Sequence, residues 1–382
     1  MSHTPTPPHP LPKLDDEILL MIFAKTDPKT ATKCKALSKR WNLRLGSPLF
    51  AKQNYKENKD KNMQVVATLA CPGRGQHCFS MVRVDMQTKL QSQGKVPDPI
   101  GNFNSFQVIG SSNGLLCVKF SLGNVHSALA VWNPLTRKRL IIRDHSTKHK
   151  NFAISEYAFG HIFETPYYAI VHVSKKRYSD TTMSWSLYSS RAKNWECKGS
   201  FETIFDKLGP TYVVHRGVVY WIGWQGVAIP KPKCIVSFNL RNRIFVQEVI
   251  PQRVKSRFHT LSIVKDEVAF VSSFYASQFK TVVDVYQVTR IGSCGLSWGK
   301  LFRIPSMSVP FTPTMFVGRY MLNVVESRSG PYNANDAERT DLLIAKHDYE
   351  ADRSQDLLCT SWDEIVHLNT VIVHSPGIYT VE

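Results

Sequence analysis

Residues 112–118 read SNGLLCV, and the segment LAVWNPLTR follows them at residues 129–137. Each segment joins a run of aliphatic or aromatic side chains, typical of a strand, to polar turn residues. An Asn-Gly pair precedes the first run, and glycine readily adopts the positive φ that tight turns need. An Asn-Pro pair follows the apolar part of the second run, where it marks a turn. The two segments therefore predict two β-strands with turns at their ends.

The same two-part pattern recurs along the chain. Its further copies are HRGVVYW (215–221) with IVSFNLR (235–241), KDEVAFV (265–271) with VDVYQ (283–287), and GRYMLNV (318–324) with LLIA (342–345). Copies recur roughly every 50 residues, the period of a kelch-type propeller blade. A four-stranded blade cannot cover both of its faces alone, whereas neighbouring blades around an axis can. The pattern therefore predicts an all-β propeller of about six blades over residues 63–382.

Single residues of this region are assigned structural roles. The apolar strand at Asn369–His374 has no blade of its own, so we expect it to pair with the first blade near Val65–Ala70 and close the ring. Five aromatic side chains are expected between blades: Trp132, Trp195, Trp221, Tyr286 and Trp298. Three glycines are expected at turns with positive φ, namely Gly114, Gly217 and Gly318. Asn133-Pro134 and Asn239 are expected to mark the turns after the second strand of each pattern.

The chain before this β region has helical character. Residues 11–41 read LPKLDDEILLMIFAKTDPKTATKCKALSKRW. Acidic residues 15–17 precede an apolar stripe at residues 18, 19, 22 and 23, as at the start of an amphipathic helix. Asp27-Pro28 and Ser38 are start signals for two further short helices. Such a small unit cannot enclose all of its apolar side chains, so some face either the chain's own β domain or another protein.

The sequence predicts four consecutive regions. Residues 1–10 are expected to be a disordered leader, and residues 11–50 form the small all-α unit of three short helices. Residues 51–62 (AKQNYKENKDKN) are expected to form a charged helix tail or linker. Residues 63–382 form the propeller.

Composition restricts the class of protein. The formal net charge is +18, spread along the chain, which favours acidic partners; no zinc finger, RNP signature or helix-turn-helix indicates direct nucleic-acid binding. The first residues lack the apolar core of a signal peptide, and no apolar run is long enough to span a membrane. The eight cysteines form no C-x-x-C pair, as expected for reduced thiols in the cytoplasm, the nucleus or both.

The sequence contains only weak candidates for catalytic motifs. Gly73-Arg-Gly75 lacks the rest of a dinucleotide loop, and the chain has neither a G-x-S-x-G elbow nor a Walker loop. His145 and His149 have the spacing of a helical metal pair, but their segment is typical of a surface loop. We therefore expect no catalytic residue, no bound metal and no cofactor.

The helical segment resembles an F-box. Leu14–Leu19, Ile22-Phe23, Asp27–Thr30, Cys34 and Leu37–Trp41 carry the resemblance, and Asp15 stands where the family usually has proline. The resemblance implies docking on the Skp adaptor of a ubiquitin ligase and, through it, on cullin and RING subunits. The residues expected on the adaptor-binding surface are Leu14, Ile18, Leu19, Ile22, Phe23, Cys34, Leu37 and Trp41.

The β region resembles the plant F-box associated interaction domain, through GSSNGLLC (110–117) and WNPLTRK (132–138). His161 stands where the family usually has an aromatic residue after Phe-Gly. The segment Tyr167–Val171 also departs from the family pattern. The resemblance implies a non-catalytic substrate-recognition subunit of a Skp–cullin–F-box ubiquitin ligase. Loops at one end of a propeller are the usual binding site, and the candidate substrate contacts are Arg177, Tyr178, Trp224, Lys231, Arg328 and Tyr332.

The sequence is also compatible with two other classes of function. One is a scaffold that binds the adaptor without delivering a substrate. The other is a kelch-like enzyme, such as an oxidase, which would need metal ligands that converge on the propeller axis; the sequence shows no such cluster.

Overall fold

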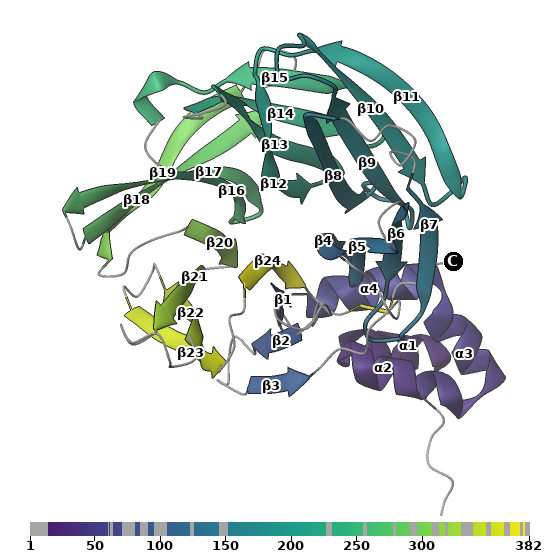
Figure 1. Cartoon of the computed structure of the whole chain (residues 1–382). Helices are drawn as coiled ribbons and strands as arrows, with labels where there is room; N and C mark the ends of the chain where they lie inside the picture. Colours follow the sequence, from purple (N-terminus) through teal and green to yellow (C-terminus); the bar gives the residue numbers. More distant parts are fainter. Residues whose placement is uncertain are drawn as a thin grey trace, which may run out of the picture.

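The computed structural model contains a small helical domain followed by antiparallel β-sheets that succeed one another around a common centre (Figure 1). It describes residues 14–59, 61, 64–70, 81–84, 91–94, 105–122, 126–144, 152–226, 231–254, 258–277, 280–290, 296–307, 313–317, 320–329, 339–348, 353–362, 367–374 and 377–378. The expected leader, residues 1–10, lies outside this set. No helix among the described residues is long and apolar enough to cross a membrane.

The helical domain contains α1 (Asp16–Lys25), α2 (Pro28–Cys34), the 3₁₀ helix η1 (Lys35–Leu37), α3 (Lys39–Gly46) and α4 (Pro48–Asn58). The three helix starts predicted from the sequence are confirmed. The side chains of Asp15, Asp27 and Ser38 each accept a hydrogen bond from a backbone N–H in the first turn of the helix that follows. These bonds satisfy donors that have no partner within the helix.

The fourth helix corrects the prediction of three helices and a linker from residue 51. The side-chain amides of Asn54 and Asn58 are buried, and each donates hydrogen bonds to the carbonyls of Ala24 (3.1 Å) and Thr26 (2.9 Å). These carbonyls lie at the C-terminal end of α1, where helix carbonyls lack intrahelical partners. The first part of the expected linker therefore belongs to the helical domain. Its start signal, Ser47 followed by proline, is present in the sequence.

The described part of the β region contains five four-stranded sheets. Their strands are β4 (Ser105–Ser112), β5 (Leu115–Leu122), β6 (His126–Trp132), β7 (Arg139–Arg143); β8 (Ile154–His161), β9 (Tyr168–Lys175), β10 (Thr182–Ser189), β11 (Asn194–Glu202); β12 (Lys207–His215), β13 (Val218–Gln225), β14 (Lys231–Asn239), β15 (Phe245–Val249); β16 (Phe258–Val264), β17 (Glu267–Ser277), β18 (Lys280–Arg290), β19 (Leu296–Met307); and β20 (Pro313–Val317), β21 (Tyr320–Ser329), β22 (Arg339–Asp348), β23 (Arg353–Trp362). A second 3₁₀ helix, η3 (Gln252–Val254), follows β15. Within these five sheets, consecutive strands pair antiparallel, as expected for propeller blades.

Neighbouring sheets share hydrophobic cores. One cluster joins the sheet β8–β11 to β12–β15 and contains Ala158 and Trp221; the next joins β12–β15 to β16–β19 and contains Ile235 and Phe270. A third joins β16–β19 to β20–β23. Each sheet thus buries its faces against the sheets beside it, which is the physical reason for stacking around an axis.

The ring is closed by the last strand. β24 (His367–His374) pairs antiparallel with β1 (Gln64–Ala70), with Ala67 opposite Val371, and β24 also lies against β4. This pairing confirms the prediction for the strand near Asn369–His374. β1 in turn contacts β2 (Met81–Val84), which pairs with β3 (Gln91–Gly94). The blade count of about six stays a prediction.

The predicted packing residues lie largely as expected. Trp221 is fully buried between two sheets, Trp132 is buried, and the Trp195 indole donates to the carbonyl of Arg143 in the neighbouring sheet (3.1 Å). Tyr286 and Trp298 pack against the core shared by β12–β15 and β16–β19. Gly114 (φ 81°) and Gly217 (φ 74°) have the expected positive φ, whereas Gly318 lies outside the described residues.

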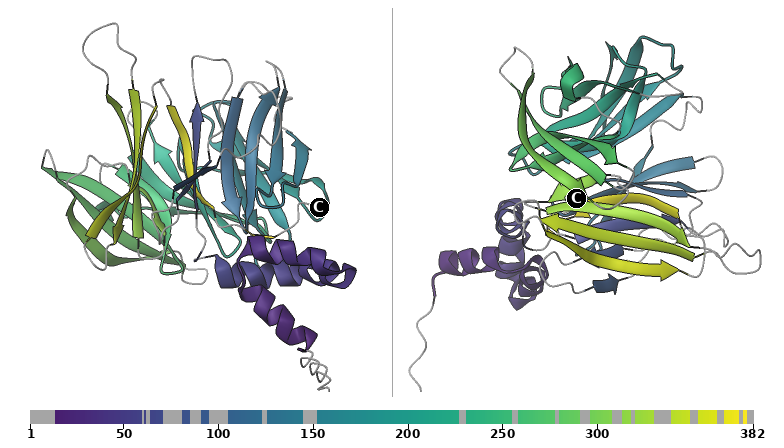
Figure 2. Two further views of the ribbon diagram at one scale, coloured as in Figure 1. Left: turned by 90° about the horizontal axis from the view of Figure 1, so that it is seen from below. Right: turned by 90° about the vertical axis from the view of Figure 1, so that its left-hand side faces the viewer.

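The helical domain lies at one end of the strands (Figure 2). This end carries the β4–β5 and β6–β7 turns, since the C-terminal segment that contacts α4 also contacts both turns. Because the strands of each sheet alternate in direction, the last residues of β9, β13 and β21 lie at the opposite end. We refer to the two as the helix end and the far end.

Candidate functional site

An exposed apolar ridge runs along α1 and the residues just before it. Leu14, Ile18, Met21 and Ile22 are 55%, 47%, 61% and 47% exposed. Their spacing places them on one face of the helix, while Ala24 points into the helical domain and is buried. We call these four residues the α1 ridge. Large exposed apolar side chains that form one contiguous patch are typical of a protein–protein interface.

Leu37 in η1 is a further exposed apolar residue, with 64% of its surface accessible. Sequence reasoning missed Met21 on the ridge and also missed Leu43 and Leu49, which are 77% and 78% exposed. Their apolar character was the available signal. The 3.6-residue period assigned Met21 to neither face, because the expected stripe was built on residues 18, 19, 22 and 23.

The structure divides the eight predicted adaptor-binding residues into two groups. Leu14, Ile18, Ile22 and Leu37 are exposed, whereas Leu19, Phe23, Cys34 and Trp41 are half-buried. Phe23, Cys34 and Trp41 pack against the core of the helical domain, and the rings of Phe23 and Trp41 meet edge to face with centroids 5.1 Å apart. The half-buried residues therefore hold the helices together and support the α1 ridge from behind.

Ion pairs fix α3 against the start of α1. Arg44 donates to the carboxylates of Asp16 and Glu17, each at 3.0 Å, and Arg40 pairs with Asp16. These groups are partly solvent-exposed, so each pair adds at most about 1 kcal/mol to stability. Their contribution is orientation: they hold the start of α1 over α3 and neutralise two of the cations of α3.

The C-terminal segment connects the helical domain to the sheets. The carbonyl of Gly377 accepts a hydrogen bond from the side-chain amide of Asn133 (2.9 Å). A Cβ at Gly377 would lie 2.8 Å from the carbonyl oxygen of Asn113 and 3.2 Å from the ring of Tyr55 in α4, so this position tolerates no side chain without movement. The backbone at Gly377 is thus held tightly between a propeller turn and the helical domain.

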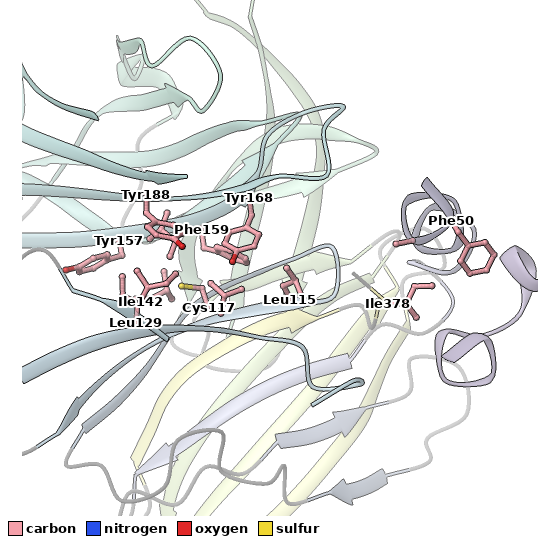
Figure 3. Packing of buried hydrophobic residues seen from close by; sticks show 14 of the residues in the cluster. Phe50, Leu115, Cys117, Leu129, Ile142, Tyr157, Phe159, Tyr168, Tyr188 and Ile378 are labelled. Carbon is pink, nitrogen blue, oxygen red and sulfur yellow. The ribbon is translucent and has the colours of Figure 1, made fainter. Parts of the chain in front are cut away.

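Ile378 completes the junction. Its side chain is 2% exposed and belongs to a core cluster that contains Phe50 and Ala51 of α4 together with Leu115 of β5 (Figure 3). The helical domain and the propeller therefore share one continuous core. The direction of the α1 ridge relative to the far end is set by this contact rather than by a flexible linker.

The predicted substrate contacts occupy the far end where they are described. Arg177 and Tyr178 are exposed in the β9–β10 link, and Lys231 is exposed at the start of β14. Trp224 is half-buried and packs between sheets, with the centroid of its ring 5.8 Å from that of His259. Trp224 is therefore a packing residue rather than an exposed loop residue. Arg328 lies in β21 opposite Thr340, and Tyr332 lies outside the described residues.

A buried polar group lies at the far end between the first two four-stranded sheets. Asp144 is 1% exposed; it accepts hydrogen bonds from Tyr157 (2.8 Å) and Ser127, and Lys119 is 3.9 Å away. Nearby, burial raises the pKa of Glu156 to about 7, against the opposing effect of Lys207 and Lys119. Asp144 is thus satisfied by its neighbours, which fits a structural role.

The described part of the chain offers no group of three His, Cys, Asp or Glu side chains arranged for a metal ion. His145 and His149 lie outside that part, so the spacing argument about them stays a prediction. What the described geometry provides is a pair of surfaces, an apolar one at the helix end and a polar, partly basic one at the far end.

Comparisons with known proteins agree with this division. A family model of the F-box domain matches residues 11–52, and one of the F-box associated beta propeller domain matches residues 74–363. A protein of Arabidopsis thaliana, whose name places it among the F-box proteins, is 21% identical over 309 residues, which cover 76% of this chain and 78% of the relative.

Solved propellers are distant in sequence. The β-propeller domain of the Trilobed protease from Pyrococcus furiosus has a TM-score of 0.35 and 11% identity, and it covers 67% of this chain and 72% of its own. The WD40 domain of SCAP from fission yeast has a TM-score of 0.33 and 9% identity, and the match covers 78% of this chain and 87% of that domain's chain.

Proposed function

Because the chain belongs to the F-box associated beta propeller family and carries an F-box, we propose that it is the substrate-recognition subunit of a Skp–cullin–F-box ubiquitin ligase. In this proposal the α1 ridge docks on the Skp adaptor, which connects the chain to the cullin and RING subunits. The far end of the propeller binds the protein to be ubiquitinated. The proposed place of action is the cytoplasm, the nucleus or both.

The observation that carries the proposal is the exposure of the α1 ridge. In the alternative arrangement, the helical domain packs its apolar residues against the chain's own β domain. That arrangement requires Ile18 and Ile22 to be covered, whereas each is 47% exposed. Burial of a large apolar side chain from water stabilises a complex by up to about 1.5–3 kcal/mol, and roughly half of that is available to each ridge residue. Leu14, Met21 and Leu37 add to this, which leaves a surplus over the cost of association.

The mechanism needs no catalytic residue in this chain. A receptor accelerates ubiquitin transfer by raising the effective concentration of a substrate lysine near the loaded enzyme. Such a device requires a defined geometry between the adaptor-binding and substrate-binding surfaces. The shared core around Ile378 and the fixed backbone at Gly377 supply that geometry.

The experiment that tests the adaptor-binding step measures the affinity of a purified Skp adaptor for the full-length chain. Ile18→Asp and Ile22→Asp place a charge in the expected interface, and each is expected to weaken binding roughly 100-fold or more. Ile244→Asp is the matched control, since Ile244 is 55% exposed in a propeller turn remote from the helices. Equal affinity of the wild type and the two ridge variants would refute the proposal.

The substrate-delivery step has its own test. Proteins captured with the wild type are compared with those captured with a far-end variant, Arg177→Glu combined with Tyr178→Ala. A substrate is expected to be lost from this variant and to be ubiquitinated in a reconstituted ligase containing the wild type but not Ile18→Asp. Binding without any ridge-dependent ubiquitination would indicate a scaffold instead of a receptor.

A further inference from the structure

The residues between β9 and β10 form an exposed link at the far end of the propeller. They read KRYSDT (176–181), and the side chains of residues 176–179 are all exposed. Two cations and a tyrosine therefore precede a serine that solvent can reach. Serine hydroxyls are common sites of covalent phosphorylation, and an enzyme that modifies one must be able to reach its oxygen.

The Ser179 hydroxyl is not used by the fold. Within the part of the chain that the structure describes, this hydroxyl makes no hydrogen bond. The turn is instead closed by Asp180, whose carboxylate accepts a hydrogen bond from the N–H of Arg177 (3.0 Å) and whose N–H donates to the carbonyl of Arg177 (3.2 Å). A group added to the Ser179 oxygen therefore breaks no described contact of the link.

Backbone hydrogen bonds hold both ends of the link. The carbonyl of Lys176 accepts from the N–H of Ala153 (3.1 Å), and the carbonyl of Thr181 accepts from the N–H of Thr203 (2.7 Å). Between these anchors the turn is shaped by the two bonds that involve Asp180. A turn held by so few bonds opens locally at a low cost in free energy. The link can therefore extend into the groove of an enzyme while β9 and β10 stay paired.

The two cations before Ser179 are available to a partner. Lys176 and Arg177 are exposed, and neither forms an ion pair with another described residue. Among the exposed serines and threonines that the structure describes, Ser179 is the one that has cations both two and three positions before it. Protein kinases distinguish their substrates by the pattern of charges around the acceptor hydroxyl. This pattern suits a kinase whose substrate groove carries carboxylates.

We propose that Ser179 is a phosphorylation site for a serine/threonine kinase that selects cations before its target. In this reaction the Ser179 oxygen forms a bond to the γ-phosphorus of ATP, the bond between that phosphorus and the β–γ bridging oxygen breaks, and ADP leaves with the electron pair. The hydroxyl proton passes to a carboxylate of the kinase. The chain supplies the acceptor oxygen and the charges that position it.

Phosphorylation reverses the net charge of the link. Residues 176–181 contain two cations and one carboxylate. A phosphate ester adds a charge of about −1.5 to −2 at pH 7, so the net charge changes from positive to negative. Arg177 and Tyr178 belong to the proposed substrate-binding surface, so the far end then presents the opposite charge to a substrate. This consequence rests on the proposed function, whereas the phosphorylation site itself does not.

The test measures phosphate transfer to the folded, full-length chain. The probe is ATP with the catalytic subunit of cyclic-AMP-dependent protein kinase, a kinase that selects cations before serine. Mass spectrometry of the digested product is expected to place the phosphate on Ser179. The variant Ser179→Ala is expected to lose the phosphate from the peptide that contains residues 176–181.

A matched pair of variants tests the role of the two cations. Lys176→Gln combined with Arg177→Gln keeps the hydroxyl and removes both charges, and it is expected to lower the initial rate at Ser179 roughly tenfold or more. Arg241→Gln combined with Lys265→Gln removes the same charge from exposed turns of two other sheets. This control is expected to be modified at Ser179 within roughly twofold of the wild-type rate. Far-UV circular dichroism verifies that both variants are folded.

Three outcomes would overturn the inference. In the first, the folded chain takes up phosphate at other residues while Ser179 stays unmodified. In the second, Ser179 is modified only after the chain has been denatured by heat, which would show that the folded link does not enter the groove of the kinase. In the third, the two double variants are modified at Ser179 at equal rates, which would show that the cations do not select the site.

These measurements are independent of the proposed function, because they do not involve the adaptor. If Ile18→Asp binds the adaptor as tightly as the wild type, the proposed function fails and the phosphorylation of Ser179 is unaffected. If Ile18→Asp loses adaptor binding and the folded wild type is not phosphorylated at Ser179, only the inference about Ser179 fails.

Discussion

The side-chain amide of Asn133 donates a hydrogen bond of 2.9 Å to the carbonyl of Gly377, a residue 244 positions later in the chain. This bond joins the first four-stranded sheet to the segment that continues into Ile378 and the core of the helical domain. The α1 ridge and the far end of the propeller are therefore held in one frame by residues that neither surface contains.

Replacement of Asn133 by aspartate tests this frame. A carboxylate keeps the turn bonds to Leu135 and Thr136 but has no donor for the carbonyl of Gly377. We expect a loss of roughly 1–3 kcal/mol, the cost of a buried polar group left without its partner. Hydrogen exchange should accelerate in residues 377–378 and in α4.

The control is Asn239→Asp. Asn239 makes the same turn bonds in the β14–β15 turn, to the N–H groups of Arg241 (2.9 Å) and Asn242 (3.1 Å), far from the C-terminal segment. Its substitution should leave the exchange of α4 unchanged. Similar exchange in the two variants would show that the bond to Gly377 does not hold the domains together.

A second prediction concerns the two groups of residues in the helical domain. Trp41→Ala removes the ring that packs on Phe23 and should cost roughly 2–3 kcal/mol of stability, less than for a fully buried tryptophan. Ile18→Ala should change stability by less than about 0.5 kcal/mol, since its side chain is largely exposed. Urea unfolding followed by far-UV circular dichroism measures both. Comparable losses would contradict the assignment of Ile18 to an open surface.

A third prediction tests the closure of the ring. Ala67 lies opposite Val371 in the β1–β24 ladder, and residues directly opposite in antiparallel strands have Cα atoms about 4.5–5.5 Å apart. Cysteines at both positions should form a disulfide, because this separation suits one. Mass spectrometry of the oxidised protein would detect the linked peptides. The control pairs Ala67→Cys with Ile372→Cys, because a shift of one residue directs the second cysteine to the other face of the sheet. A higher yield of disulfide in this control pair would show that the strands pair in a different register.

A fourth prediction concerns pH. Burial lowers the pKa of His161 to about 3, whereas an unfolded histidine titrates near 6.5. The folded state thus favours the neutral ring, so this contribution to stability is complete above pH 6.5 and is lost as the pH falls toward 3. Between pH 7.5 and pH 5 the wild type should lose roughly 2 kcal/mol through this group.

His161→Phe tests the assignment by removing the titration. Thermal unfolding at the two pH values should show a smaller acid effect in this variant. Ser112→Ala, which removes a hydrogen bond to the His161 ring (3.0 Å) without removing the ring, should keep the acid effect of the wild type. An acid effect in His161→Phe as large as that of the wild type would assign the titration to other groups.

Much of this architecture follows from local patterns. The helix starts at Asp15, Asp27 and Ser38 are readable because a capping side chain acts within its own first turn. The left-handed turn at Gly114 can likewise be predicted from a local signal, because glycine adopts a positive φ without steric cost. A separate helix α4 was not predicted, although Ser47-Pro48 is a helix-start signal, because the charged residues from 51 onward were assigned to a helix tail or linker. The two buried asparagines on α4 gave no local signal, since their partners lie at the end of α1.

The sequence by itself determined the kinds of elements and their order, because apolar periodicity and turn chemistry act over a few residues. Tertiary structure alone decided which apolar helix residues are exposed and how the helical domain is oriented. Those properties depend on contacts between residues such as Tyr55, Asn133 and Gly377, which are far apart in the chain. Their packing is a property of the folded whole, and no local pattern encodes it.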